Sequence, residues 1–287
     1  MTIHSGMIVS DYWQVLSGDI AISTTVYAYG NMTVSSGGSV TSTTVNSGGD
    51  MWVSGGSATS TTVNSGGWMW IASGGSATST TVNSGGDMIV SGGSAISTTV
   101  NSGGMMEVNR GGSAISTTVN TGGSMRVYWY ATSTTVNAGG SMLVNVGSAI
   151  STTVNSGGEM TVYGGSGVTS TTVNSGGSMT VAYRGTHAAS TMVNNGGVLY
   201  VSSGCSASIA FNPWSAGTVV SASGATVTYL ERAGVYWGNN VSGTIGWGDI
   251  AENVIISSGV SMLVYDGGTA SGVLLEPSGV LYVRYKQ

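Results

Sequence analysis

The feature that most constrains this chain is a pair of short phrases that return about every 19 residues along most of its length. The serine that opens the first phrase, STTV, occurs at Ser23, Ser42, Ser60, Ser79, Ser97, Ser116, Ser133, Ser151 and Ser170, and at Ser190 in the variant STMV. The methionine of the second phrase occurs at Met32, Met51, Met69, Met88, Met106, Met125, Met142, Met160 and Met179, and Leu199 takes its place in the next copy. Self-similarity at a fixed period is typical of repeat folds, in which each unit buries its apolar face only by stacking on its neighbours.

Each unit reads as short β-strands separated by tight turns. In one copy Met51 and Val53 alternate with Trp52, and paired glycines end each apolar run after a few residues. No segment has the length and the period of a helix. A unit of about 18–19 residues fits one coil of a parallel solenoid, so the sequence predicts an all-β, single-stranded parallel β-solenoid (β-helix) with roughly 15 coils. The rule for parallel crossovers predicts right-handed coiling.

Stacked coils place equal residues above one another, so the repeat also predicts the core. Met51 and Val53 point inward, and Trp52 between them points outward. Another inward column is small and consists of Val40, Ala58, Ala77, Ala95, Ala114, Ala131, Ala149, Val168 and Ala188. Large residues in one column and small ones in another fill a thin core.

The turns carry two further repeated features. The Gly-Gly pairs are expected to supply positive φ angles at the corners. An asparagine column precedes one of the two pairs in each unit, at Asn46, Asn64, Asn83, Asn101, Asn120, Asn137, Asn155, Asn174 and Asn194. These asparagines are expected either to adopt left-handed geometry or to stack as a ladder of side-chain amides.

The composition excludes several classes of function. Lys and Arg together number 6 and Asp and Glu 11, for a net charge of −5, so the chain lacks a basic surface for nucleic acid or anionic lipid. The single Cys205 cannot form an internal disulfide, and with His4 and His187 it is too little for a structural zinc site. Asp50 and Asp87 share an outward column, but no basic residue lies close to them in sequence. We therefore expect no enzyme activity, no metal and no cofactor.

The repeat also divides the chain into segments. Residues 1–22 are expected to form an N-terminal coil or cap, 23–202 the regular repeats, 203–250 irregular decorated coils and 251–287 C-terminal solenoid coils, all within one continuous domain. Met262 and Leu281 resume the 19-residue spacing in the last segment. The N-terminal stretch lacks a basic region followed by an apolar run, and no run reaches the roughly 18 apolar residues that span a bilayer. Neither an export signal nor membrane insertion is expected from these residues.

Function on a solenoid depends on the outward columns, because the inward columns are committed to packing. The outward positions around each Met change from coil to coil, and in two adjacent coils they hold Trp52, Trp68 and Trp70. Such a cluster could stack against sugar rings or dock another protein, so these three residues are the candidate ligand or partner patch. The alternatives are that the column merely tolerates exposed aromatic residues or that a neighbouring rod covers them.

The repeats resemble those of the AIDA-type autotransporter passengers, which are adhesin stalks. The segment GGSATSTTVNSGGWMWIASGG, residues 55–75, has the paired glycines, the Ala, the Thr-x-Val and the Ser-Gly-Gly of that family at the family's spacing. Met69 stands where the family commonly has Gln, so this core column is more apolar than usual. The resemblance covers residues 23–202 well and 251–285 loosely.

The resemblance implies a cell-surface rod that promotes adhesion, aggregation and biofilm, and in some members of the family serines of the repeats carry heptose. By position, the candidate O-glycosylation sites are Ser47, Ser65, Ser84, Ser102, Ser156 and Ser175. Thr121, Ala138 and Asn195 interrupt that column.

The sequence therefore predicts a non-enzymatic, extracellular or surface-exposed β-solenoid stalk for adhesion or self-association. Its expected partners are other copies of itself, or glycans or proteins on host or bacterial surfaces, and they include neither nucleic acid nor the membrane interior. Two alternatives remain open. One is a self-assembling structural filament or scaffold, and the other is a carbohydrate-binding module that uses the tryptophan patch.

Overall fold

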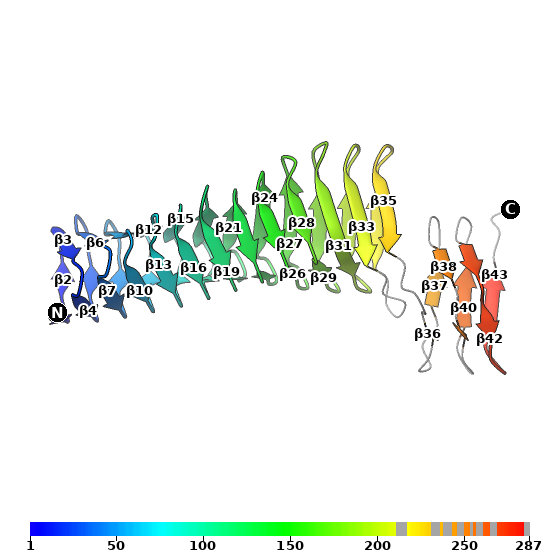
Figure 1. Cartoon of the computed structure of the whole chain (residues 1–287), viewed down its shortest axis with the longest axis horizontal. Coiled ribbons are helices and arrows are strands. Elements are labelled where there is room, and N and C mark those ends of the chain that lie inside the picture. The colour runs from blue at the N-terminus through cyan, green and yellow to red at the C-terminus, as the bar shows by residue number, and fades with distance from the viewer. Residues whose placement is uncertain are drawn as a thin grey trace.

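The computed structural model describes residues 1–210, 217–230, 236–237, 243–245, 250–252, 255–256, 261–264 and 269–283 of the 287-residue chain. Within these ranges every regular element is a β-strand. The strands wind into a long rod in which each turn of chain stacks on the one before it (Figure 1). The predicted all-β parallel solenoid is confirmed. Nowhere in the described ranges is there a helix long and apolar enough to cross a membrane.

One coil consists of three short strands, one on each of three faces. In the coil that contains Met51, β9 (Asp50–Val53) lies on the first face, β10 (Ser57–Thr59) on the second and β11 (Thr62–Val63) on the third. Each strand pairs in parallel with its equivalent in the next coil, so that Met51 lies opposite Met69 of β12 (Trp68–Ile71). Identical letters of the repeat therefore sit above one another, as the period predicted.

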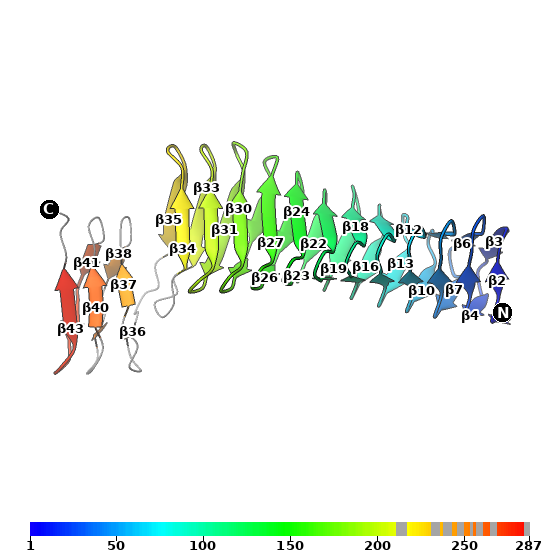
Figure 2. The same cartoon turned by 180° about the vertical axis from the view of Figure 1, so that it is seen from behind.

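The first face is a 12-stranded sheet, and the other two faces join at β31 into a 23-stranded sheet (Figures 1 and 2). The first face contains β3 (Tyr12–Val15), β6 (Asn31–Val34), β9, β12, β15 (Asp87–Val90), β18 (Met105–Val108), β21 (Ser124–Val127), β24 (Ser141–Asn145), β27 (Glu159–Tyr163), β30 (Ser178–Val181), β32 (Val198–Val201) and β34 (Thr218–Ser221). The second contains β1 (Ile3–Ser5), β4 (Ile20–Ile22), β7 (Ser39–Thr41), β10, β13 (Ser76–Thr78), β16 (Ser94–Ile96), β19 (Ser113–Ile115), β22 (Tyr130–Thr132), β25 (Ser148–Ile150), β28 (Gly167–Thr169), β31 (His187–Val193), β33 (Ser206–Ala210) and β35 (Thr226–Leu230). The third contains β2 (Ile8–Val9), β5 (Thr25–Val26), β8 (Thr44–Val45), β11, β14 (Thr81–Val82), β17 (Thr99–Val100), β20 (Thr118–Val119), β23 (Thr135–Val136), β26 (Thr153–Val154) and β29 (Thr172–Val173).

The continuous stack has about 12 coils, fewer than the roughly 15 expected from the length of the chain. Further along, the described strands form three small parallel sheets, with β40 and β43 pairing Met262 with Leu281 as their spacing predicted. These sheets contain β36 (Tyr236–Trp237), β39 (Ile255–Ile256) and β42 (Leu274–Leu275); β37 (Gly243–Ile245), β40 (Ser261–Val264) and β43 (Val280–Val283); and β38 (Ile250–Glu252) with β41 (Thr269–Ser271). Much of the segment expected to be irregular, 203–250, lies outside the described residues. Residues 1–22 contain β1 to β4 and stack in register on the second coil.

The core is a set of straight columns, as expected. Met51, Val53, Ala58 and Val63 are at most 1 % exposed, and their equivalents are buried in every coil from β6 to β30. Outward residues alternate with them, so that Trp52 between Met51 and Val53 is exposed. Because large methionines face small alanines, the interior has no column in which two large side chains must compete for space.

The two glycines of a corner pair have different functions. Gly66 has a φ of +70°, as the sequence predicted. Gly67 does not share that conformation, and a Cβ on it would lie 2.7 Å from the carbonyl oxygen of Val45 in the preceding coil. The expectation of positive φ is therefore right for the first glycine and wrong for the second, which is small because the backbone of the neighbouring coil passes close to it.

The asparagines stack as an amide ladder, and none of them adopts left-handed geometry. Each Nδ2 donates to the Oδ1 of the asparagine one coil earlier, as Asn83 does to Asn64 at 2.9 Å and Asn101 to Asn83 at 2.9 Å. The chain of donors runs without a break from Asn194 back to Asn46. Of the two expectations for this column, the ladder is the correct one.

Left-handed geometry instead falls on the serine that opens each STTV phrase. Ser97 has a φ of +55°, and the equivalent serines from Ser23 to Ser190 have φ values between +51° and +56°. This conformation turns the chain from the second face to the third and reverses the local bonding, because Ser97 N donates to Ile115 O of the following coil. The next residue, Thr98, is buried.

Candidate functional site

The three tryptophans of the candidate patch lie on the first face, on two neighbouring strands. Trp52 belongs to β9, and Trp68 and Trp70 belong to β12. The parallel register places Trp70 opposite Trp52 and Trp68 opposite Asp50. Because alternate residues of a strand point to the same side, all four side chains project from the outer surface of the sheet. The structure therefore brings together the residues that the sequence singled out.

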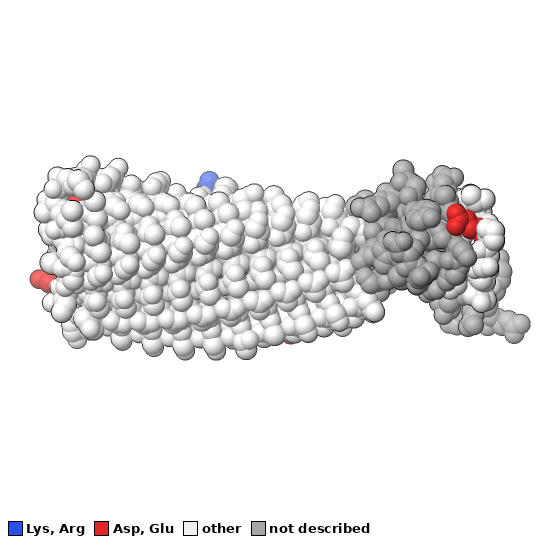
Figure 3. Space-filling model, turned by 90° about the horizontal axis from the view of Figure 1, so that it is seen from below, with Lys and Arg blue, Asp and Glu red and all other residues white. Residues whose placement is uncertain are grey.

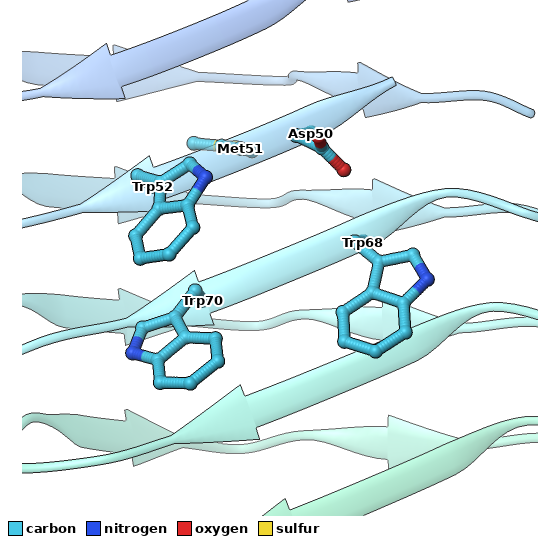
Figure 4. A pocket seen from close by; sticks show the side chains of 5 residues that line it. All are labelled: Asp50, Met51, Trp52, Trp68 and Trp70. Atoms are coloured by element: carbon cyan, nitrogen blue, oxygen red, sulfur yellow. The ribbon is translucent and has the colours of Figure 1, made fainter. Parts of the chain in front are cut away.

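The three indoles line one pocket and form what we call the aromatic shelf, which consists of Trp52, Trp68 and Trp70. The rings of Trp52 and Trp70 are stacked, with centroids 5.1 Å apart and planes inclined by 11°. Trp68 lies two residues from Trp70 on β12, and Figure 4 shows Asp50 of β9 next to it. Trp52 is 39 % exposed and Trp68 is 45 % exposed, so both offer ring surface to solvent.

The shelf lines a shallow, open pocket of about 290 Å³. Its lining residues are Asp50, Met51, Trp52, Trp68 and Trp70. Met51 is fully buried and contributes to the floor from the core side, whereas the indoles and the carboxylate form the accessible part (Figure 4). A pocket with aromatic walls and one polar group is a common form of binding site for a small ligand.

Carboxylates continue the column of Trp68. The register places Asp50 on one side of Trp68 and Asp87 on the other. Partial burial raises the pKa of Asp87 above its ordinary value, and the negative charge of Glu107 raises it further. Carboxyl groups therefore lie on both sides of Trp68 along its column. Nothing in this arrangement brings the carboxylates of Asp50 and Asp87 together with a nucleophile or a base, and Trp68 lies between the two residues.

The six candidate glycosylation serines lie on a different edge of the rod. All of them are exposed, and each occupies the turn that leads from the third face back to the first. They are Ser47, Ser65, Ser84, Ser102, Ser156 and Ser175. Because the coils stack in register, these hydroxyls form a straight ridge, which we call the serine ridge.

A glycine of the following coil lies beside each hydroxyl of the serine ridge. A Cβ added to Gly66, Gly85, Gly103, Gly122, Gly176 or Gly196 would come within 2.5 to 2.8 Å of the Oγ of the serine one coil earlier. Glycine leaves space for that hydroxyl in its present rotamer and also adopts the positive φ of the turn. The repeated Gly therefore keeps the serine hydroxyls of the ridge accessible.

The sequence analysis did not identify a second column of serines as a candidate site. The left-handed serines of the STTV phrases are exposed in the coils from Ser23 to Ser170. Their signal was present in the sequence, because this serine is never replaced in ten successive copies, whereas the serine ridge is interrupted at Thr121, Ala138 and Asn195. An uninterrupted residue at an exposed position indicates a backbone requirement or a shared surface function.

The described residues offer no site for a metal ion. They contain no group of three or more His, Cys, Asp or Glu side chains arranged to hold one. Cys205 is a buried free thiol, and its Sγ lies 3.0 Å from the carbonyl oxygen of Tyr183. Burial raises the pKa of this thiol.

One long side of the rod is nearly uncharged. On the side shown in Figure 3, charged side chains are few, and most of the described surface between the two ends consists of uncharged residues in regular rows. Such a surface offers little electrostatic repulsion to another copy of the rod.

Comparison with known proteins identifies the family. The chain is similar to the crystal structure of a hyper-glycosylated fragment of TibA, whose glycosylation is catalysed by TibC. The two share 38 % sequence identity with a TM-score of 0.70, and the match covers 99 % of this chain and 97 % of the TibA fragment. No protein-family model and no curated protein sequence matches the chain. TibA is an AIDA-type autotransporter adhesin with a β-solenoid passenger, and at this identity and coverage the chain belongs to the same family of β-solenoid adhesin stalks.

Proposed function

We propose that this rod is a cell-surface or secreted stalk that joins cells through contacts between its own copies, and that the serine ridge carries O-linked sugar. The observation that carries the proposal is the serine ridge itself, an exposed row of hydroxyls with a glycine beside each one. The related TibA fragment was crystallised in a hyper-glycosylated form, which supports sugar attachment on a rod of this kind. The stalk acts by presenting surface, and we assign it no catalytic role.

The geometry of the serine ridge suits modification by an enzyme that acts repeatedly. Each acceptor lies in a turn at the outside of the rod, and its neighbours along the ridge present the same backbone conformation one coil away. A transferase that fits one turn therefore fits the next turn without readjustment. The sugar would cover an edge that is otherwise made of Ser, Gly and Asn side chains, and would add a hydrated layer to it.

Self-association follows from the sides of the rod. Rows of uncharged side chains repeat at the coil spacing of about 4.8 Å, so two rods that meet side by side can form the same contact at every coil. Each single contact is weak, but the contacts add along the length of the rod. Sugar on the serine ridge would restrict which sides of two rods can meet.

The test is the intact mass of the protein produced with and without a TibC-type glycosyltransferase, followed by peptide mapping. We expect mass increments of one sugar each and modified peptides that contain the serine ridge. Ser102→Ala should remove one increment. The matched control is Ser97→Gly in the same coil, which keeps the left-handed backbone and should leave the number of increments unchanged. Increments that map to the STTV serines, or no increments, would contradict the assignment of the serine ridge.

Light scattering on the same samples tests the self-association. We expect species larger than one chain, whose size grows with protein concentration. A strictly monomeric rod at all concentrations, in both the modified and the unmodified form, would show that the sides of the rod do not drive adhesion between copies.

A further inference from the structure

The aromatic shelf is a surface feature that neither the core nor the serine ridge explains. It lies on the first face of the rod, and its pocket is open to solvent. We infer that Asp50 and the aromatic shelf form a binding site for a neutral oligosaccharide. This inference is independent of sugar attachment to the serine ridge, because it concerns binding of a free or cell-bound glycan by the shelf.

The exposed indoles are the first argument. Two neighbouring coils place three tryptophans at outward positions where the other described coils have mostly polar or aliphatic residues, with Tyr12 and Tyr200 as single aromatic residues near the two ends. None of these three rings is completely buried, so they expose apolar surface to water and do not add to the packing of the core. A contiguous apolar patch of this kind on a polar rod indicates a surface that is covered in use.

The shape of the shelf favours a flat, ring-shaped ligand. Trp52 and Trp70 lie nearly parallel, and Figure 4 shows their rings following one another along the column with Trp68 alongside. Along the strand, Trp68 and Trp70 are two residues apart, which is about 7 Å. Two linked sugar units can therefore rest on the shelf at once, each with its C–H face on an indole. The indole N–H groups remain available as hydrogen-bond donors to hydroxyls.

The polar group at the edge of the shelf fits a sugar as well. Asp50 is only partly buried, and its carboxylate lies beside Trp68 (Figure 4). A carboxylate accepts hydrogen bonds and donates none, so it suits the hydroxyl rim of a pyranose ring. A neutral sugar satisfies this acceptor, whereas an acidic sugar would be repelled by Asp50, Asp87 and Glu107 on the same face.

An organic cation is the competing ligand, since indoles and carboxylates also attract positive charge. Recognition of a compact cation works best when several ring faces converge on one point, as in an aromatic cage. The planes of Trp52 and Trp70 are inclined by only 11°. These two rings therefore lie nearly parallel and do not form the walls of a cage around one cation. The geometry therefore favours the extended neutral ligand.

The test is titration of the 287-residue chain with cellohexaose, maltohexaose and chitohexaose, in which tryptophan fluorescence and calorimetry measure binding. We expect saturable binding of at least one of the three probes. Trp70→Ala and Trp68→Ala should each weaken it by about tenfold, which corresponds to about 1.4 kcal/mol, because each removes an aromatic ring on which a sugar rests. Trp70→Phe, which keeps an aromatic ring, should weaken binding less than Trp70→Ala.

The matched control is Trp129→Ala. Trp129 is 48 % exposed but lies outside the shelf, so its replacement should leave binding unchanged. Each variant is accepted only if its circular dichroism and thermal unfolding match the parent. No saturable binding of any of the three probes would overturn the inference. So would tighter binding of tetramethylammonium than of any oligosaccharide, if Trp70→Ala abolished it, because the shelf would then be a cation site.

The outcome is separable from that of the proposed function. Intact mass reports sugar that is covalently attached to the serine ridge, and titration reports reversible binding to the shelf. If intact mass shows no attached sugar, the inference about the shelf is unaffected. If titration shows no binding to the shelf, the proposal for the serine ridge is unaffected.

Discussion

At the scale of single residues, three consecutive residues of the STTV phrase have three different structural roles. Ser97 takes the left-handed conformation that turns the corner, Thr98 is buried and Thr99 faces outward. Left-handed backbone is costly for residues other than glycine, and serine is tolerated because its side chain is short. The sequence alone does not reveal this turn, because period-two alternation can be read from the residue types and the sign of a φ angle cannot.

The buried threonines leave an unusual polar column in the core. Thr98 is 1 % exposed, and its Oγ1 has no hydrogen-bond partner among the described residues. The same is true of Thr24, Thr43, Thr61, Thr80, Thr117, Thr134, Thr152, Thr171 and Thr191. Burial of a hydroxyl without a partner typically costs about 1–3 kcal/mol.

Replacing one of these hydroxyls by a methyl group should therefore stabilise the rod. We expect Thr98→Val to raise the free energy of unfolding by about 1 kcal/mol, because valine has the same shape and no polar group to satisfy. Denaturant unfolding followed by circular dichroism measures the change. The control is Thr99→Val, which alters an outward residue and should have little effect. If Thr98→Val instead lowered the free energy of unfolding, the Thr98 hydroxyl would have a hydrogen-bond partner, and that bond would stabilise the column.

At the scale of one coil, the paired glycines show how far the sequence predicted the structure. The pairs correctly marked the corners, and the strands between them have the expected faces. The sequence pattern does not predict how closely two coils approach each other at a corner, because that distance depends on the backbone of a residue about 20 positions away. Gly103 has a φ of +71°, whereas Gly104 lies where a Cβ would be 2.7 Å from the carbonyl oxygen of Val82.

This difference predicts unequal effects of the same substitution at neighbouring positions. Gly103→Ala should cost about 1–2 kcal/mol of stability, the usual penalty for a side chain in left-handed geometry, since the Ser84 side chain that its Cβ meets can rotate away. Gly104→Ala should cost about 3 kcal/mol or more, because its Cβ meets backbone that cannot move without separating two coils. Urea unfolding of the two variants, made and measured together, compares them. Equal losses would mean that the coils can separate easily at this corner.

The asparagine ladder and the aromatic shelf were predictable to different degrees. Alternation and register were enough to place Trp52, Trp68 and Trp70 on one outer face, because both follow from the period. The stacking of Trp52 on Trp70 and the position of Trp68 beside them depend on side-chain rotamers, which the letters do not encode. For the asparagines the sequence left two possibilities open, and the bonding from Asn101 to Asn83 decides between them.

At the scale of the whole molecule, the rod is a sum of similar layers. Each coil contacts only its two neighbours, so its stability depends on its own turns and on two interfaces. The contacts between strands reach about 19 residues along the chain and rarely further. Removal of one complete coil should therefore leave a shorter rod of the same kind, whereas removal of part of a coil should bring unlike columns into contact.

The last prediction tests this layered construction directly. Deletion of residues 98–116 joins Ser97 to Thr117 and keeps every column in register, because it removes one full period. We expect this variant to stay folded, with an unchanged circular dichroism spectrum and a rod shorter by about 4.8 Å in small-angle X-ray scattering. The control, deletion of residues 98–107, removes about half a coil and places inward residues on outward positions, so it should lose cooperative unfolding and become sensitive to protease. If the two deletions behaved alike, stability would reside in particular coils and not in the repetition of one interface, and the rod could not be lengthened or shortened by whole units.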